Sequence, residues 1–299
     1  GSEMCIRDSG SATTIRDGFN GIDIINNNNF SFAYFSINAV GGGSSKTATI
    51  SDFKISRIAR DGFVSTWYDQ SGHDRHASQD TEAAQPFIVK RGGIVKIGDK
   101  PAVHQDNRSS GGNKAGLGVE SYNPTQNAGD LTEYSFFAHY KSTGHFGSST
   151  QGQLFSSGGT ITSSSYGGLT IGNRDGRRIS ARHRNNTELS QVLASANTST
   201  DEAYGSIEQN ILASFHYKDG VTLTGRDNGV ETARPTSSPV SPHARNSANQ
   251  GRVRLLSSFS FKQIEPFKAP VTEIIFYDKD IRHNAEAIET NMNTYYQIY

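Results

Sequence analysis

Basic side chains recur at every second position in one segment of the chain. Arg178, Ser180, Arg182 and Arg184 alternate with Ile179, Ala181 and His183, so on a β-strand the arginines share one face. His216 with Lys218, Thr224 with Arg226, and Arg252 with Arg254 repeat the pattern. An arginine fork pairs bidentately with a carboxylate or sulfate. If these faces line one concave side, they form a basic groove for an anionic polysaccharide. The predicted glycan-binding residues are Arg178, Arg182, Arg184, His216, Lys218 and Arg226. The alternative interpretation is a solvated outer face with ordinary surface charge.

A second group of residues surrounds the only tryptophan. Residues 63–68 alternate as a strand with two usable faces, and Asp69, Gln70, Ser71 and Gly72 then supply turn chemistry. We expect the six residues Trp67, Tyr68, Asp69, Gln70, Ser71 and Gly72 to fix the fold, with Trp67 and Tyr68 structural rather than sugar-stacking.

This motif is the first of several that follow one another in a recognisable order. After the run from Trp67 to Gly72 come His76-Ala77-Ser78-Gln79, Ala84-Gln85-Pro86-Phe87-Ile88-Val89 and Gly98-Asp99-Lys100-Pro101-Ala102-Val103. The order resembles the catalytic-domain family of α-L-arabinofuranosidase B and its non-catalytic relatives in phage structural and bacterial surface proteins. The resemblance covers residues 60–106, and a weaker resemblance is found at the C-terminus. It implies a concanavalin A-like β-sandwich, and fold alone does not assign an activity.

The resemblance also shows where a hydrolase would carry its carboxyl groups. A retaining glycosidase needs two of them about 5–5.5 Å apart. Aligning the turn at residues 169–173 with that of the family places Arg184 at the nucleophile and Arg182 at a neighbouring aspartate. The acid falls in residues 257–260, which read Ser-Ser-Phe-Ser. Arginine can neither attack an anomeric carbon nor donate a proton at neutral pH. We therefore expect no hydrolase activity of this type.

Related domains often carry Ca²⁺, and Asp69 with Asp74 could help to hold one. Two carboxylates supply few of the six to eight oxygens that Ca²⁺ requires, and we expect no other cofactor.

Composition favours one loop-rich, all-β domain. Of 299 residues 33% are hydrophobic, 31 are glycine, the mean hydropathy is −0.58 and the formal charge is zero. Alternating runs at residues 132–140, 211–218 and 221–226, with turn signals at Asp219-Gly220 and Asn228-Gly229, predict antiparallel strands. Ile281, Ala285, Ile288, Met292 and Tyr295 are spaced as the apolar stripe of a C-terminal helix. The predicted fold is a concanavalin A-like antiparallel β-sandwich (jelly roll) with a short C-terminal helix.

The expected division of the chain has three parts. Residues 1–10 resemble translated sequencing-adaptor sequence, which would make Cys5 non-native. Residues 11–47 form an N-terminal element of uncertain placement with a strand expected at 30–37, and residues 48–299 form the sandwich, with a first strand expected at 48–55.

The predicted function is a non-catalytic glycan-binding or adhesion module of a virion or cell-surface protein, located outside the cell. Its expected partner is a polysaccharide or cell-surface glycan. Two alternatives remain open, an α-L-arabinofuranosidase-type hydrolase and a purely structural virion protein that forms a homo-oligomer. No nucleic-acid partner is expected of a neutral chain without a basic tract. No apolar run reaches the ~20 residues of a membrane span.

Overall fold

The structure is a computed structural model. It describes residues 3–8, 11–15, 34–38, 60–105, 116–125, 131–142, 152–157, 160–162, 165–166, 168–174, 178–184, 189–193, 209–233, 242, 253–257, 267 and 269–299. The chain divides into two compact units, residues 1–59 and residues 60–299.

The N-terminal unit contains a three-stranded antiparallel sheet. Its order is β2 (Ser11–Ile15), β1 (Glu3–Asp8), β3 (Tyr34–Asn38). Strand β3 overlaps the strand expected at residues 30–37, while the one expected at 48–55 lies outside the described residues. The adaptor-like segment supplies β1, and its foreign origin remains a prediction.

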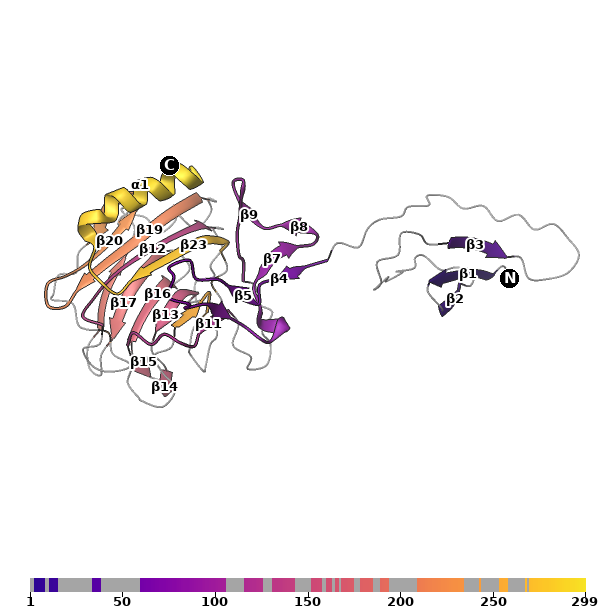
Figure 1. The fold of residues 1–299 in the computed structure, drawn as a ribbon, viewed down its shortest axis with the longest axis horizontal. Helices are drawn as coiled ribbons and strands as arrows, with labels where there is room; N and C mark the ends of the chain where they lie inside the picture. The colour runs from indigo at the N-terminus through magenta and orange to yellow at the C-terminus, as the bar shows by residue number, and fades with distance from the viewer. Residues whose placement is uncertain are drawn as a thin grey trace, which may run out of the picture. The chain divides into compact units, whose positions relative to one another are not determined.

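The larger unit is built on two antiparallel sheets (Figure 1). The eight-stranded sheet runs, in spatial order, β18 (Leu189–Leu193), β17 (Arg178–Arg184), β16 (Gly168–Arg174), β13 (Gln153–Ser157), β22 (Val253–Leu255), β11 (Leu117–Val119), β6 (Ala77–Ser78), β5 (Thr66–Trp67). The five-stranded sheet runs β21 (Val230–Ala233), β20 (Thr222–Asp227), β19 (Gln209–Lys218), β12 (Glu133–Ser142), β23 (Val271–Tyr277).

Two tight turns set the register of the five-stranded sheet. Gly220, between β19 and β20, has a φ of +63°. Asn228 and Gly229, between β20 and β21, have φ of 48° and 80°, as a two-residue hairpin turn with both central residues at positive φ requires. Both turn predictions are confirmed.

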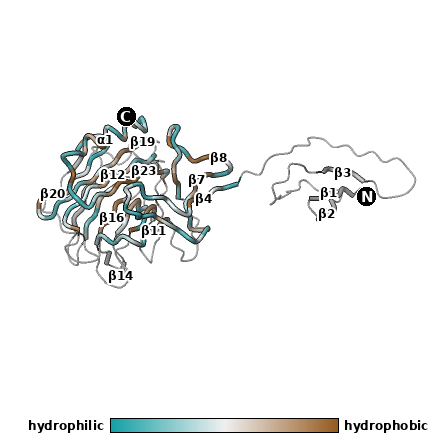
Figure 2. The backbone as a smooth tube through the Cα atoms, viewed as in Figure 1, coloured by the Kyte–Doolittle hydropathy of each residue, from teal (hydrophilic) through white to brown (hydrophobic). Residues whose placement is uncertain are grey.

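The core lies between the two sheets. Alternate residues of β12 and β19, including Tyr134, Phe136, Phe215 and Tyr217, are fully buried and belong to one hydrophobic cluster. Phe155 of β13 crosses from the other sheet, stacking on Phe276 with ring centroids 4.9 Å apart. Burying each such side chain contributes about 1.5–3 kcal/mol. Hydrophobic stretches follow the strands of both sheets in Figure 2. The predicted antiparallel β-sandwich is confirmed.

The C-terminal helix α1 (Ala285–Tyr296) covers the outer face of the five-stranded sheet. Ala285 and Met292 pack against Phe137 and Leu212, residues that point away from the core. The predicted stripe is correct except at its end, because Tyr295 is 58% exposed and Tyr296 packs in its place. The described helices are all too short or too polar to cross a membrane.

Smaller elements complete the unit: β4 (Gly62–Phe63), β7 (Phe87–Lys90), β8 (Gly93–Ile94), β9 (Lys96–Ile97), β10 (Lys100–Pro101), β14 (Thr160–Thr162), β15 (Ser165–Tyr166) and the 3-10 turns η1 (Glu82–Ala84) and η2 (Arg282–Asn284). The single strand expected at residues 63–68 is divided. Its start pairs with β7 as β4, and Thr66 and Trp67 pair with β6 in the eight-stranded sheet.

Candidate functional site

Polar and small residues form one row across the outer face of the eight-stranded sheet. In each pair of neighbouring strands, the residue of the row on one strand lies directly opposite the residue of the row on the next strand. The row, called here the outer row, is Thr66, Ser78, Gly118, Arg254, Ser156, Thr170, Arg182 and Gln191. Directly opposed residues of antiparallel strands share a face. The neighbours of the row along each strand, such as Ala77, Leu117 and Val253, belong to the core on the opposite face. The outer row therefore lies on the side of the sheet that points away from the core.

Arg254 stands in the middle of this row, above Gly118. A Cβ atom built on Gly118 would lie 3.9 Å from the Arg254 Cζ and 3.1 Å from Glu120 Oε1. A guanidinium and a carboxylate oxygen thus converge on the space that glycine leaves open. Arg254 is half-buried and Glu120 is exposed.

Arg182 lies in the same row, three strands from Arg254. It is half-buried, while its neighbours Ala181 and His183 point into the core. The His183 Nε2 is hydrogen-bonded to the Tyr134 hydroxyl at 2.7 Å, which fixes this part of β17 against the five-stranded sheet. Between the two arginines Ser156 is buried, and its hydroxyl donates to the Ser257 carbonyl at 3.2 Å.

The structure places the other predicted arginines of this strand at its ends. Arg178 pairs in register with Arg174, and Arg184 with Gly168 and Leu189. Their backbone positions share the face of Arg182, and their side chains lie outside the described residues.

His216, Lys218 and Arg226 belong instead to the five-stranded sheet. His216 is buried on its outer face, where its Nδ1 lies 2.9 Å from the Ser135 hydroxyl oxygen. Lys218 is exposed at the end of β19. The expectation of one basic groove is corrected here. His216, Lys218 and Arg226 lie on the five-stranded sheet and Arg182 lies on the eight-stranded sheet, and each sheet has its own outer face.

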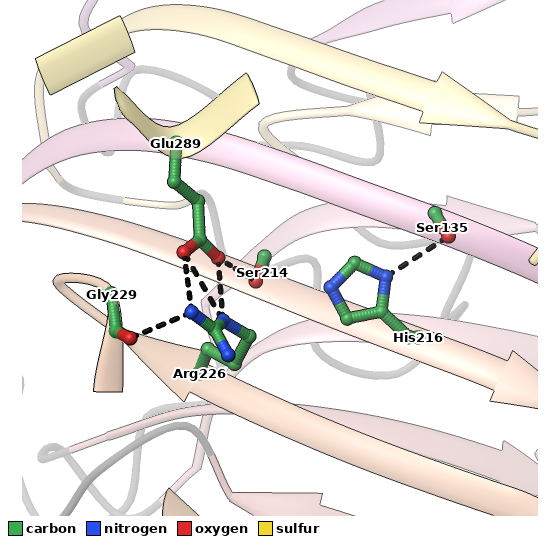
Figure 3. A network of polar contacts seen from close by, with 6 residues as sticks. All are labelled: Ser135, Ser214, His216, Arg226, Gly229 and Glu289. Atoms are coloured by element: carbon green, nitrogen blue, oxygen red, sulfur yellow. Dashed lines mark hydrogen bonds and ion pairs between the residues drawn. The ribbon is translucent and has the colours of Figure 1, made fainter. Parts of the chain in front are cut away.

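Arg226 has its own partner on the helix. The Arg226 Nε donates to both oxygens of Glu289, at 2.9 and 3.1 Å, and its Nη2 donates to Glu289 Oε2 at 3.0 Å. The same Nη2 donates to the Gly229 carbonyl at 2.7 Å, and the Ser214 hydroxyl donates to Glu289 Oε1 at 2.6 Å. Figure 3 shows these contacts joining α1 to β19 and β20. Arg226 therefore serves to attach the helix.

The turn that follows Trp67 is organised by Asp69. The Asp69 Oδ1 accepts the Ser71 N–H at 2.8 Å, and Oδ2 accepts the Ser71 hydroxyl at 2.8 Å and the Arg75 N–H at 3.0 Å. Burial raises the pKa of this carboxyl, but hydrogen bonds from Ser71 and Arg75 outweigh it and lower the pKa to about 2. Asp69 thus holds the turn together, as the motif predicted.

Asp74 is exposed with a φ of 54°. Among the described residues no group of three or more His, Cys, Asp or Glu could hold a metal ion. Calcium binding by Asp69 and Asp74 remains a prediction.

Sequence reasoning missed part of the outer row. Ser78, Gly118 and Thr170 carry no charge signal. Their signal is a single small or polar residue between apolar neighbours, as in Leu117-Gly118-Val119 and Val253-Arg254-Leu255. Such a triplet indicates a strand with one face in the core and the other turned outward.

Comparison with known proteins identifies no family for the chain. No family model matches it, and no curated protein matches. The resemblance to the arabinofuranosidase B family therefore remains a prediction.

Several solved structures are similar in part. The CBM40 domain of the Ruminococcus gnavus IT-sialidase, bound to α2,3 sialyllactose, is 14% identical with a TM-score of 0.42, over 58% of this chain and 92% of its own. The binding domain of Paraclostridial Mosquitocidal Protein 1 is 10% identical with a TM-score of 0.43, over 80% and 52%. The binding domain of botulinum neurotoxin DC, in complex with SialylT, is 9% identical with a TM-score of 0.38, over 79% and 44%. Similarity at this level assigns no function to the chain.

Proposed function

We propose that residues 60–299 form a non-catalytic glycan-binding module that binds anionic oligosaccharides on the outer face of the eight-stranded sheet. The observation that carries this proposal is the in-register outer row, with Arg254 and Arg182 in it. Three strand spacings separate them, about 14 Å. The ligand is therefore an extended chain with more than one acidic group, rather than a single acidic sugar.

The chemistry of the row suits such a ligand. Arginine forks bind carboxylate or sulfate bidentately, and the hydroxyls of Ser78 and Thr170 can both donate to and accept from sugar hydroxyls. Gly118 has no side chain, so none rises from the sheet at the centre of the row. Because every member sits on a strand of a packed sandwich, the spacing of the groups is fixed before the ligand arrives, which reduces the entropic cost of binding.

The outer row also favours binding over hydrolysis. None of its eight members is a carboxylate, and Glu120 is the acidic residue placed beside it by the Gly118 geometry. A retaining glycosidase would need a second carboxyl group about 5–5.5 Å away. On the surface of a cell or virion, such a module would act in adhesion. We include in the proposal that copies of the module associate with one another on that surface.

A glycan array with neutral, uronate, sialylated and sulfated oligosaccharides tests the proposal. We expect saturable binding to anionic members, weakened by salt because the contacts are ionic and partly exposed. Arg182→Ala and Arg254→Ala should each reduce affinity about tenfold, the loss of one charge-assisted contact of about 1.5 kcal/mol.

The matched control is Lys96→Ala, which removes one exposed positive charge from β9, outside the eight-stranded sheet. Equal affinity in all three variants would exclude the outer row as the binding site. Release of sugar from any array member would favour the hydrolase alternative.

A further inference from the structure

An exposed aromatic side chain stands at the edge of the face that carries the outer row. Tyr68 is 63% exposed. Trp67 packs against the core, and Tyr68 follows it directly after the end of β5, with its exposed ring turned away from the core. The ring of His76 meets that of Tyr68 edge to face, with centroids 5.1 Å apart. This contact holds the tyrosine ring in place on the outer face.

The face continues without a break from Tyr68 to the middle of the row. Thr66 lies opposite Ser78, and Ser78 lies opposite Gly118. Above Gly118 stand the Glu120 carboxylate and the Arg254 guanidinium. An aromatic ring, a carboxylate and a guanidinium therefore follow one another across four neighbouring strands. The strand spacing puts the backbones of β5 and β22 about 14 Å apart.

The fold does not require the Tyr68 side chain. Asp69 organises the following turn through Ser71 and Arg75, and Gln70 Nε2 donates to the backbone carbonyl of Tyr68 at 3.3 Å. Those bonds survive truncation of the tyrosine ring. An amphipathic tyrosine ring that is exposed beside polar groups offers a ligand an apolar surface to pack on.

We propose that Tyr68 is the stacking platform of a second subsite, which takes an uncharged sugar ring of the same oligosaccharide whose acidic group binds Arg254. The inference rests on the proposed function and deepens it. The C–H face of a pyranose packs on the tyrosine ring, and the Glu120 carboxylate accepts hydrogen bonds from the hydroxyls of the sugar between the two anchors. The ligand class is an oligosaccharide in which acidic and uncharged rings alternate. In this proposal Tyr68 binds the ligand instead of having the structural role expected from sequence. Trp67 packs against the core and retains the structural role.

The test uses residues 1–299 and hexasaccharides of hyaluronan and of unsulfated chondroitin, in which glucuronate alternates with an uncharged hexosamine ring. Free glucuronate is the matched ligand with one acidic ring. Trp67 is the only tryptophan of the chain and is the neighbour of Tyr68, so its fluorescence reports on this subsite during titration. Calorimetry gives the affinities independently. Tyr68→Ala should lower the affinity for the hexasaccharides about two- to tenfold and leave that for glucuronate unchanged, and Tyr68→Phe should bind as the wild type does.

The control is Tyr295→Ala, since Tyr295 is 58% exposed but lies on α1. Its affinity should equal that of the wild type. If Arg254→Ala weakens hexasaccharide binding and Tyr68→Ala does not, the subsite is refuted while the proposed function stands. If the wild type binds neither hexasaccharide, the subsite with alternating acidic and uncharged rings is refuted, while the proposed function fails only if no anionic member of the glycan array binds.

Discussion

The ion pair between Arg226 and Glu289 gives a prediction whose size follows from the structure. Glu289 is buried, with 3% of its side chain exposed, while 22% of the Arg226 side chain is exposed. Removing one partner of a buried pair leaves an uncompensated charge, which costs about 3–5 kcal/mol. Because water reaches part of Arg226, we expect Arg226→Met to cost about 3 kcal/mol, at the lower end of that range.

The reverse substitution should cost less. In Glu289→Met the guanidinium keeps the Gly229 carbonyl and its partial access to water, so we expect a loss of about 2 kcal/mol. The double variant removes both charges together, and apolar replacement of a whole buried pair is often close to neutral. The Ser214 hydroxyl then loses its acceptor, which costs about 1 kcal/mol. The double variant should therefore be more stable than Arg226→Met alone.

Urea unfolding of the four proteins, followed by circular dichroism, measures this cycle. The Arg226→Met variant should also lower the melting temperature by about 6–12 °C, since 1 kcal/mol shifts a domain of this size by about 2–4 °C. Strictly additive single effects would show that the pair is not coupled, and would refute the reasoning that the helix is anchored through a desolvated charge pair. Glycan binding serves as the control, because α1 covers the five-stranded sheet and the outer row is on the other one.

Three further predictions concern other parts of the larger unit. Burial lowers the pKa of His139 and of His216 to about 4, so the folded state is most stable above pH 6.5 and loses stability as pH falls towards 4, and His216→Gln should flatten this pH dependence of the unfolding free energy by about 2 kcal/mol. Glu120→Gln keeps an acceptor oxygen for the sugar hydroxyls and removes a negative charge beside Arg254, so the affinity for anionic oligosaccharides should rise about two- to fivefold at low salt and less at high salt; calorimetry at two salt concentrations checks this, and an effect that does not depend on salt would count against an ionic contact of the ligand with Arg254. Asp69→Ala removes three hydrogen bonds of the turn and should cost about 2 kcal/mol, seen as a lower urea midpoint, whereas an unchanged midpoint would mean that the turn does not depend on Asp69.

The secondary structure of the five-stranded sheet could be predicted from sequence because its signals are local. The alternation at residues 132–140 and 211–218 gives β12 and β19, and the turns at Gly220 and Gly229 join neighbouring strands over three and two residues. The apolar spacing from Ile281 to Met292 gives α1 in the same way. Each of these patterns is complete within about 15 residues, so the sequence window contains all the information that decides it.

The middle of the eight-stranded sheet could not be predicted in this way. Strands β11 and β22 have three residues each and pair across more than 130 positions of sequence. Strands so short carry too few alternations to set a register, and their pairing is decided by the long-range packing of Leu117, Val253 and Leu255. The arginine of the row that matters most for the proposal, Arg254, is placed by that packing.

The alternation of residues along a strand predicts which side chains share a face. It does not predict whether that face contacts solvent or another element of the fold. In β17 and in β20 a basic residue alternates with core residues in the same manner, yet Arg182 lies on the eight-stranded sheet while Arg226 lies on the five-stranded sheet and is paired with Glu289 of α1. A two-layer sandwich has two outer faces, and here the C-terminal helix covers part of one with its apolar stripe and one buried carboxylate. Arg226 is paired with Glu289 of the helix, and the buried His216 is hydrogen-bonded to Ser135, so both residues stabilise the fold. The helix packs on the five-stranded sheet and not on the face with Arg182, Arg254 and the exposed ring of Tyr68, and this difference is the reason for assigning ligand binding to that face.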